Sequence, residues 1–222
     1  MILPKTTECI LKLENSWLTI WFNRPEKRNS LSKILIKEIN QSLNFVENDP
    51  SIRGVIFRGK GNVFCAGADL KWMQSIAFKK SDSSDLAMKM SIEFGEMFKN
   101  ISNLSKVTIS VVEGACIAGA VGIVCATDFL VTTVDAKYAL TETRIGLTPA
   151  QIAPYIISKV GFKIGKKLML LGNVFNGKDA FSIGMADYVI HHNDELESEV
   201  LKIINDVKKC SPNAIAVTKK VL

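Results

Sequence analysis

Two short segments rich in glycine and alanine carry the strongest chemical signal in this sequence. They are residues 63–70 (VFCAGADL) and residues 114–120 (GACIAGA). Each follows a predicted strand, at 54–58 and 107–113, and stands where a helix is expected to begin. Small residues let a ligand approach the backbone closely, and the first N–H groups of a helix have no partner within it. Two such segments, once together, would direct two N–H donors at one oxygen, the arrangement of an oxyanion hole.

Hydrophobic patterns predict the elements that position these segments. Alternating residues at 9–14 and 17–23 indicate an antiparallel hairpin. A helical pattern over 34–46 behind a capping Ser32, followed by the strand at 54–58, indicates a crossover with parallel pairing. Further strands are predicted at 128–133, 138–140 and 186–190. Further helices are predicted from Asp69, over 86–104, from the second glycine-rich segment to residue 126, at 151–159, 162–171, 178–184 and 194–209, and from 212 onward. The polar stretch 79–85 is expected to be a mobile cover over a pocket.

The composition fits one soluble domain over residues 1–222. Hydrophobic residues make up 47% and charged residues 23% of the chain. The net charge of +6 permits a polyanionic partner, but the basic residues form no stripe with aromatics, which disfavours nucleic acid. No apolar run is long enough for a membrane span and no signal peptide is evident, so the expected location is cytoplasmic. The five cysteines show no metal-ligand spacing and are expected to be buried free thiols in a reducing compartment.

The two segments, with Asn23-Arg24-Pro25 and residues 140–149 (LTETRIGLTP), resemble the signature of the crotonase superfamily of enoyl-CoA hydratases and isomerases. The resemblance covers nearly the whole chain in the family's order. It implies an α/β crotonase fold, a spiral of ββα units with a helical C-terminal part, that assembles as a trimer or a dimer of trimers. The family usually continues further, so the C-terminal helical region is expected to be truncated here.

The resemblance also implies roles for three residues. The backbone N–H groups of Ala68 and Gly119 would hold the thioester carbonyl of an acyl-CoA and stabilise its enolate. Glu142 takes the position of the family's more widely used catalytic glutamate, a general acid/base whose pKa apolar walls would raise. Taken alone, the glycines fit tight packing at a helix start and Glu142 fits a solvated loop. Coenzyme A would enter as part of the substrate, with no separate cofactor and no metal.

Further residues complete the predicted substrate site. The acyl pocket is expected to be lined by Trp72, Met73, Met90, Ile117 and Pro149, although each also suits an ordinary core position. The loop residues Lys27 and Arg28 could meet the phosphates of coenzyme A or simply face solvent. The first segment contributes Ala66, Gly67, Asp69 and Leu70. Asp69 is best explained as the cap of the helix that it begins. Cys65, His191 and His192 are not expected to take part in catalysis.

Gly122 departs from the family pattern. Family hydratases often carry a second glutamate three residues after the oxyanion glycine, and two carboxylates can divide activation of water from protonation of carbon. One carboxylate cannot obviously do both at once, although it can move a proton between two carbons. Three functions stay open: an enoyl-CoA hydratase, a Δ3-Δ2 enoyl-CoA isomerase with a single glutamate, and a non-catalytic acyl-CoA- or protein-binding homologue. Residues 119–124 and 145–155 resemble bacterial methylglutaconyl-CoA hydratases of leucine and isoprenoid breakdown, which favours the first.

Overall fold

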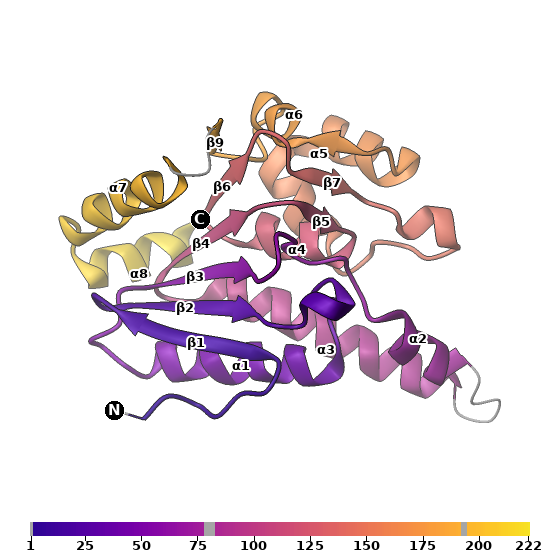
Figure 1. Cartoon of the computed structure of the whole chain (residues 1–222), viewed down its shortest axis with the longest axis horizontal. Helices are drawn as coiled ribbons and strands as arrows, with labels where there is room; N and C mark the ends of the chain where they lie inside the picture. The colour runs from indigo at the N-terminus through magenta and orange to yellow at the C-terminus, as the bar shows by residue number, and fades with distance from the viewer. Residues whose placement is uncertain (1, 78–82, 192–194) are drawn as a thin grey trace.

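The computed structural model describes residues 2–77, 83–191 and 195–222 (Figure 1). Its centre is a six-stranded sheet in the order β1-β2-β3-β4-β6-β9. The strands are β1 (Cys9–Glu14), β2 (Trp17–Phe22), β3 (Gly54–Gly59), β4 (Val107–Val112), β6 (Phe129–Thr133) and β9 (Tyr188–Ile190). A second sheet of β5 (Ala115–Ile117), β7 (Lys137–Ala139) and β8 (Phe175–Asn176) lies beyond the ends of these strands.

The N-terminal part follows the predicted crossover. β1 and β2 pair antiparallel, and Asn15 and Ser16 both have positive φ, at 50° and 68°, as a two-residue hairpin turn requires. β2 then pairs parallel with β3 after helix α1 (Lys33–Glu47). Ser32 caps that helix, because its side chain accepts a hydrogen bond from the Leu35 N–H at 3.0 Å. The predicted hairpin and parallel unit are both confirmed.

The other helices are α2 (Leu70–Ala77), α3 (Ser83–Asn103), α4 (Gly119–Ala126), α5 (Ala153–Leu171), α6 (Gly177–Ser182), α7 (Leu196–Lys208) and α8 (Pro212–Val221), with short 3₁₀ turns η1 (Pro25–Lys27) and η2 (Glu142–Ile145). None of the described helices has the length and apolarity needed to cross a membrane. Of the predicted mobile cover, residues 79–82 lie outside the described residues, and residues 83–85 begin α3.

The chain before α4 differs from the predicted elements, as does the unpredicted strand β8. The second glycine-rich segment does not open a helix directly, because the short strand β5 pairs with β7 before α4 begins. The two helices predicted at 151–159 and 162–171 correspond to the two parts of α5, and the predicted break between them is confirmed. Gly161 has φ 77° and ψ 162°, outside the helical region, and kinks α5 at that point.

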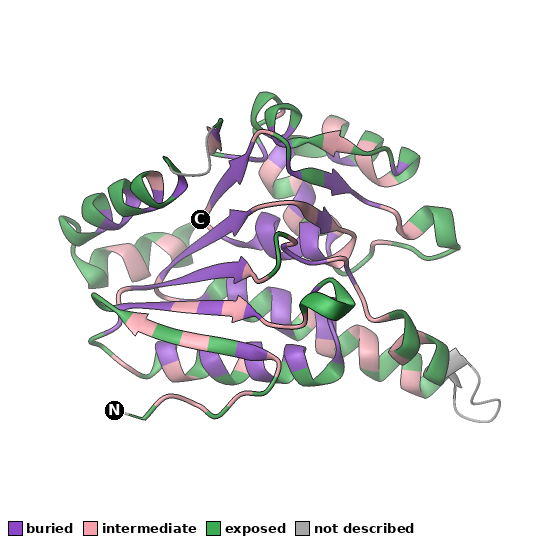
Figure 2. Cartoon of the chain, viewed as in Figure 1, coloured by how far each residue is buried: buried purple, intermediate pink, exposed green. Residues whose placement is uncertain are grey.

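The main sheet is covered on both faces. One face packs against α1, α3, α4 and α5 in a large apolar cluster. The other face presents alternate residues of β4 to α7, through Val107, Ile109 and Val111. All six residues of β4 are therefore buried, whereas in β1, at the edge, only Cys9 is buried and the following positions alternate between exposed and half-buried (Figure 2).

The carboxyl ends of the central strands point toward one side of the molecule. In Figure 1 the arrows of β2, β3 and β4 run toward the side where α2 and β5 lie. The chain that leaves β3 carries the first glycine-rich segment, and the chain that leaves β4 carries the second. Ligand sites of sheets with parallel strands commonly lie beyond this edge, so the fold brings both segments to the expected place.

Candidate active site

The two glycine-rich segments are joined directly to each other. Cys65 pairs with Cys116 in an isolated parallel bridge. The Cys65 N–H donates to Ala115 O, and the Ile117 N–H donates to Cys65 O, both at 3.0 Å. Gly67 has φ +88°, and a Cβ at this position would lie 3.0 Å from Ile117 O. Glycine therefore allows the first segment to approach the second this closely.

This junction leaves two N–H groups available to a ligand. Gly119 is the first residue of α4, so its N–H has no partner within the helix. Three nearby N–H groups are bonded to carbonyl oxygens: that of Ala66 to Arg28, that of Asp69 to Leu31, and that of Ala118 to Ala139. Among the described residues, the N–H groups of Ala68 and Gly119 donate to no protein acceptor. Both residues line one cavity of about 480 Å³.

The residue before Gly119 has a strained backbone. Ala118 has φ 53° and ψ −122°, a conformation that residues with a Cβ rarely adopt. Hydrogen bonds hold it there, because its N–H donates to Ala139 O and its carbonyl accepts from the Val121 N–H, both at 2.8 Å. Strain of this kind often marks a functional backbone. In this chain the strained residue stands immediately before Gly119, and its two hydrogen bonds fix the backbone that leads to the Gly119 N–H donor.

Replacing Ala118 by glycine is expected to stabilise the fold. Strain at a residue of this type costs about 1–3 kcal/mol, whereas the added freedom of glycine in the unfolded chain costs about 0.4–1 kcal/mol. The free energy of unfolding should therefore rise by about 1 kcal/mol, measured by urea denaturation. A lower free energy of unfolding for Ala118→Gly would mean that the alanine methyl packs more favourably than its backbone strain costs.

Asp69 and Arg24 support the first segment from outside the cavity. The Asp69 carboxylate accepts from the backbone N–H groups of Lys71 and Trp72 at 3.0 and 3.3 Å, so it caps the first turn of α2 as expected. Its other oxygen accepts from Arg24 at 2.9 Å, and Arg24 also pairs with Glu8 at 3.0 Å. Burial alone would raise the pKa of Asp69, but the hydrogen bonds from Arg24 and the backbone together lower it.

Glu142 lies in η2 and lines the same cavity as the two free N–H groups. Its Oε2 atom is buried and has no hydrogen-bond partner among the described residues. Burial raises the pKa of this carboxyl above its ordinary value of 4.5. A buried oxygen without a partner costs free energy. A hydrogen bond from a ligand, or protonation of the carboxyl, would reduce this cost.

The raised pKa predicts how Glu142 affects stability. The folded state holds the proton more tightly than the unfolded state, so this group's stabilising contribution is full below pH 4.5 and is lost as the pH rises through the folded pKa. Glu142→Gln, which copies the neutral form, should therefore melt at a higher temperature than the parent protein at pH 7. At pH 4 the two melting temperatures should converge. A constant difference at both pH values would contradict this prediction.

The rest of the cavity wall is mostly apolar. Leu70 and Met73, three residues apart on α2, share one helix face and both line the cavity, as do Met90 and Pro149. Trp72 does not, because it lies on another face of α2, where its ring stacks on Phe94 with centroids 5.9 Å apart and lines a neighbouring hollow.

Three other predicted residues also lie apart from the cavity wall. Ile117 is part of β5, where its N–H and carbonyl are directed at the first segment. Lys27 and Arg28 are exposed in and just after η1. The carbonyl of Arg28 accepts the N–H of Ala66, so this loop holds the first segment even where its side chains face solvent.

Gly122 has no room for a larger side chain. A Cβ at this position would lie 2.2 Å from Ile152 Cγ2 and 3.0 Å from Phe98 Cε1. The place of the family's second glutamate is thus occupied by Ile152. The other candidates, Glu93 and Glu96, are not in the cavity wall, and Glu93 pairs with Lys33 at 3.2 Å. Among the described residues that line the cavity, Glu142 is the only one with an ionisable side chain.

Replacing Gly122 by alanine is expected to destabilise the fold by about 1–3 kcal/mol, because the methyl overpacks a buried contact with Ile152. A smaller side chain at position 152 should relieve this overpacking. In a double-mutant cycle measured by urea denaturation, Gly122→Ala with Ile152→Ala should be more stable than the sum of the single losses implies. Strictly additive losses would show that the close contact is relaxed elsewhere.

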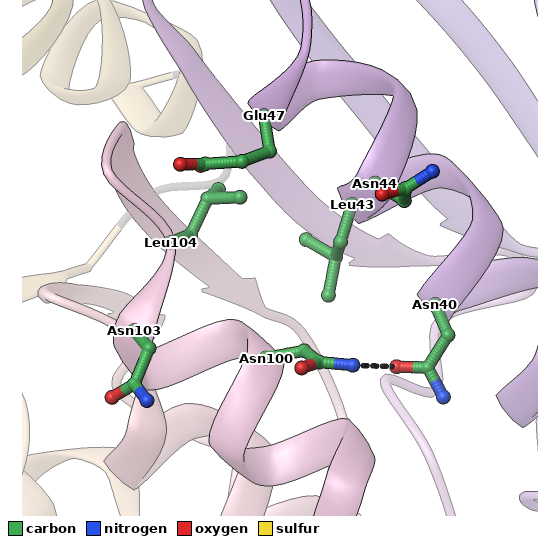
Figure 3. Close-up of a pocket in the computed structure, with 7 residues that line it drawn as sticks. All are labelled: Asn40, Leu43, Asn44, Glu47, Asn100, Asn103 and Leu104. Atoms are coloured by element: carbon green, nitrogen blue, oxygen red, sulfur yellow. Dashed lines mark hydrogen bonds between the residues drawn. The ribbon is translucent and has the colours of Figure 1, made fainter.

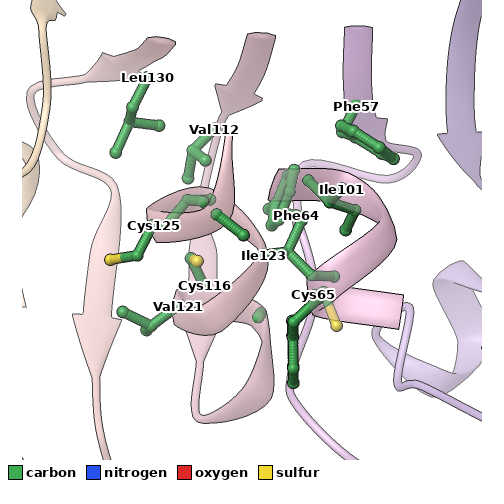
Figure 4. Close-up of a cluster of buried hydrophobic side chains, with 14 of the residues drawn as sticks. Phe57, Phe64, Cys65, Ile101, Val112, Cys116, Val121, Ile123, Cys125 and Leu130 are labelled. Atoms are coloured by element: carbon green, nitrogen blue, oxygen red, sulfur yellow. The ribbon is translucent and has the colours of Figure 1, made fainter. Parts of the chain in front are cut away.

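Three cysteines lie in the core at the joined segments: Cys65 and Cys116 belong to the segments, and Cys125 belongs to α4 (Figure 4). Burial raises the pKa of Cys65 and of Cys125 to about 12, and that of Cys116 well above its ordinary value. Thiols with such pKa values stay protonated and are poor nucleophiles. All five cysteines are free, as expected, but Cys210 is exposed instead of buried because it lies just after the end of α7. Among the described residues, no group of three His, Cys, Asp or Glu could hold a metal ion.

A second hollow, of about 250 Å³, lies between α1 and α3 (Figure 3). Its wall carries four asparagines, and Asn100 donates to Asn40 at 2.9 Å. Its one carboxylate, Glu47, already accepts from the N–H and hydroxyl of Ser105 at 3.0 and 2.9 Å. This hollow has no free acid or base, so the cavity at Glu142 is the candidate active site.

The fold and this cavity define an α/β crotonase-type protein. The sequence profile of the enoyl-CoA hydratase/isomerase family matches residues 12–222, so the chain belongs to that family of enzymes. The crystal structure of an enoyl-CoA hydratase/isomerase from Marinobacter aquaeolei is 33% identical and superposes with a TM-score of 0.91 over 96% of this chain and 81% of that one. The resemblance and the fold predicted from the sequence are both confirmed.

Two characterised relatives differ in their reactions. Methylglutaconyl-CoA hydratase of Homo sapiens is 28% identical over 91% of this chain, which spans 59% of that protein. The peroxisomal Delta(3,5)-Delta(2,4)-dienoyl-CoA isomerase of Arabidopsis thaliana is 29% identical over 98% of this chain and 81% of its own length. The family therefore includes both a lyase and an isomerase at similar distance from this chain.

Proposed function

We propose that this protein is an enoyl-CoA hydratase that adds water to, or removes it from, an α,β-unsaturated acyl-CoA of the methylglutaconyl-CoA kind. The observation that carries the proposal is the unbonded Oε2 of Glu142 in the same cavity as the free N–H groups of Ala68 and Gly119. The likeness to the human methylglutaconyl-CoA hydratase supports the substrate class. A trimer or dimer of trimers is proposed as the assembly, to be checked by sedimentation.

One carboxylate can perform hydration in two successive steps. The thioester oxygen accepts hydrogen bonds from the N–H groups of Ala68 and Gly119. Glu142 removes a proton from water as the water oxygen bonds to C3, and the C2=C3 electron pair moves to form an enolate, with its negative charge on the thioester oxygen. The protonated Glu142 then gives that proton to C2, and the carbonyl re-forms. Water has added across C2 and C3, and Glu142 is again a carboxylate.

The surroundings of Glu142 suit this double role. A carboxyl with an ordinary pKa would hold the removed proton only weakly at neutral pH. Burial raises the pKa of Glu142, which brings the energies of its two forms closer together and favours transfer in both directions. The two N–H donors stabilise the charge that develops on the thioester oxygen between the steps, an effect worth about 3–4 kcal/mol per donor.

A second candidate is a Δ3-Δ2 enoyl-CoA isomerase. It is favoured by the filled position at Gly122, where Ile152 leaves no room for a second carboxylate, and by the relationship to the Arabidopsis isomerase. Glu142 would then remove a proton from C2 of a 3-enoyl thioester and return it to C4 while the same two N–H groups hold the dienolate. This reaction needs no bound water.

The ultraviolet absorbance of the conjugated enoyl thioester separates these functions. Loss of absorbance with crotonyl-CoA or methylglutaconyl-CoA is expected for the hydratase. No loss with either, together with a gain of absorbance from a 3-enoyl-CoA, would replace the hydratase by the isomerase. Calorimetric binding of coenzyme A thioesters without turnover of any enoyl-CoA tested would instead indicate a non-catalytic binding protein.

A further inference from the structure

The mostly apolar wall of the cavity contains a pair of neutral polar side chains that are bonded to each other, in addition to Thr141 and Thr148. Ser91 comes from α3 and Gln151 from the chain just before α5, and both line the cavity that contains Glu142. The Gln151 Nε2 atom donates to Ser91 Oγ at 2.6 Å. This bond joins two walls of the cavity, and it involves neither the N–H donors of Ala68 and Gly119 nor the carboxyl of Glu142.

The Gln151 side chain lies against α3 at Gly95. A Cβ at position 95 would lie only 2.7 Å from Gln151 Oε1. The amide of Gln151 therefore rests against a helix position that carries no side chain, one turn after Ser91. The hydrogen bond orients the two side chains toward each other before a ligand arrives, and the absence of a side chain at position 95 leaves room for this arrangement.

The pair retains hydrogen-bonding capacity after its internal bond is made. A serine hydroxyl carries one hydrogen and a glutamine amide carries two. One of these three is used between the two side chains, which leaves two for a ligand, and this count is the same for either orientation of the amide. Among the described residues, neither side chain has another hydrogen-bond partner.

We infer that the Ser91–Gln151 pair binds a carboxylate carried by the acyl chain, and thus selects carboxylated enoyl thioesters. This inference rests on the proposed function, because it deepens the specificity of the same cavity. A carboxylate only accepts hydrogen bonds, and bonds to an ionised acceptor are stronger than neutral ones. A purely apolar acyl chain over the pair would cover donors without satisfying them, which disfavours its binding.

Binding of saturated thioesters tests the pair without any chemistry. Calorimetry should show that glutaryl-CoA binds the parent protein at least about tenfold more tightly than butyryl-CoA, the range expected of hydrogen bonds to a charged group. Ser91→Ala should reduce this ratio toward one. Ser102→Ala, on the same helix but not in the cavity wall, should keep it. Equal affinities of the parent protein for the two thioesters would overturn the inference.

Gly95→Ala provides a variant that disturbs the pair without weakening the helix. Alanine favours the interior of α3 by about 1 kcal/mol over glycine, and its methyl would displace the flexible end of Gln151. The variant should melt no lower than the parent protein and yet lose the preference for glutaryl-CoA. An unchanged glutaryl-to-butyryl ratio in Gly95→Ala, with the same ratio in Ser91→Ala, would show that the pair is only a structural link.

Turnover separates this inference from the proposed function. The parent enzyme should hydrate glutaconyl-CoA with a higher kcat/KM than crotonyl-CoA, and Ser91→Ala should lower the ratio of the two values. A retained binding preference without turnover of either thioester would reject the hydratase but support the pair. Turnover of both thioesters with neither a binding nor a kcat/KM preference would reject the pair but support the hydratase.

Discussion

Glu142→Gln should lower kcat for whichever enoyl-CoA the enzyme converts by about 10²–10⁴, the contribution typical of a positioned general acid/base. The amide has nearly the same size and shape as the carboxyl but can neither take a proton from water nor return it to carbon. Binding of a saturated acyl-CoA should change far less, because the two N–H donors and the apolar wall remain. Steady-state rates and calorimetry with the same protein provide both measurements.

Glu93→Gln is the matched control. Glu93 lies on α3 beside the site, and it pairs with Lys33 instead of lining the cavity. Its removal should leave kcat close to that of the parent enzyme, because a partly exposed ion pair contributes little. If Glu142→Gln retained full turnover, or if Glu93→Gln lost as much, the assignment of Glu142 as the acid/base would be wrong.

Local signals in the sequence were sufficient to predict the hairpin and the parallel crossover, whereas the crotonase fold followed from the resemblance to the family. Alternation in β1 and β2, the cap at Ser32 and the apolar runs of β3 and β4 each depend on neighbours in the chain. The two glycine-rich segments were informative for a related reason. Gly67 has a positive φ, which restricts the residue types allowed there, and Gly119 begins a helix, where its N–H has no partner within the helix.

Features set by contacts distant in sequence could not be predicted in this way. Nothing local to Gly122 indicates that Ile152 fills the place of a second glutamate. The pairing of Ser91 with Gln151 joins residues 60 apart. Trp72 was expected in the acyl pocket, but its place on α2 directs it to Phe94 instead. Each of these depends on how helices pack together, and a single sequence carries little information about that.

The oxyanion arrangement can be tested at Gly119 with one pair of substitutions. Proline is tolerated at the first residue of a helix, because the missing N–H has no partner within the helix there. Among the described residues, the Gly119 N–H also donates to no other protein acceptor. Gly119→Pro should therefore remove the ligand's hydrogen bond and lower kcat by about 10²–10³.

Gly119→Ala separates the loss of the N–H from the addition of carbon atoms. A Cβ at this position would lie 3.5 Å from Leu31 Cδ1 and 3.7 Å from Phe94 Cε1, which are ordinary contacts. Alanine should therefore fit and cause a much smaller loss of kcat than proline. Proline also restricts Ala118, so thermal unfolding of both variants is measured to show that they fold. A folded proline variant with the kcat of the alanine variant would mean that the Gly119 N–H does not stabilise the transition state.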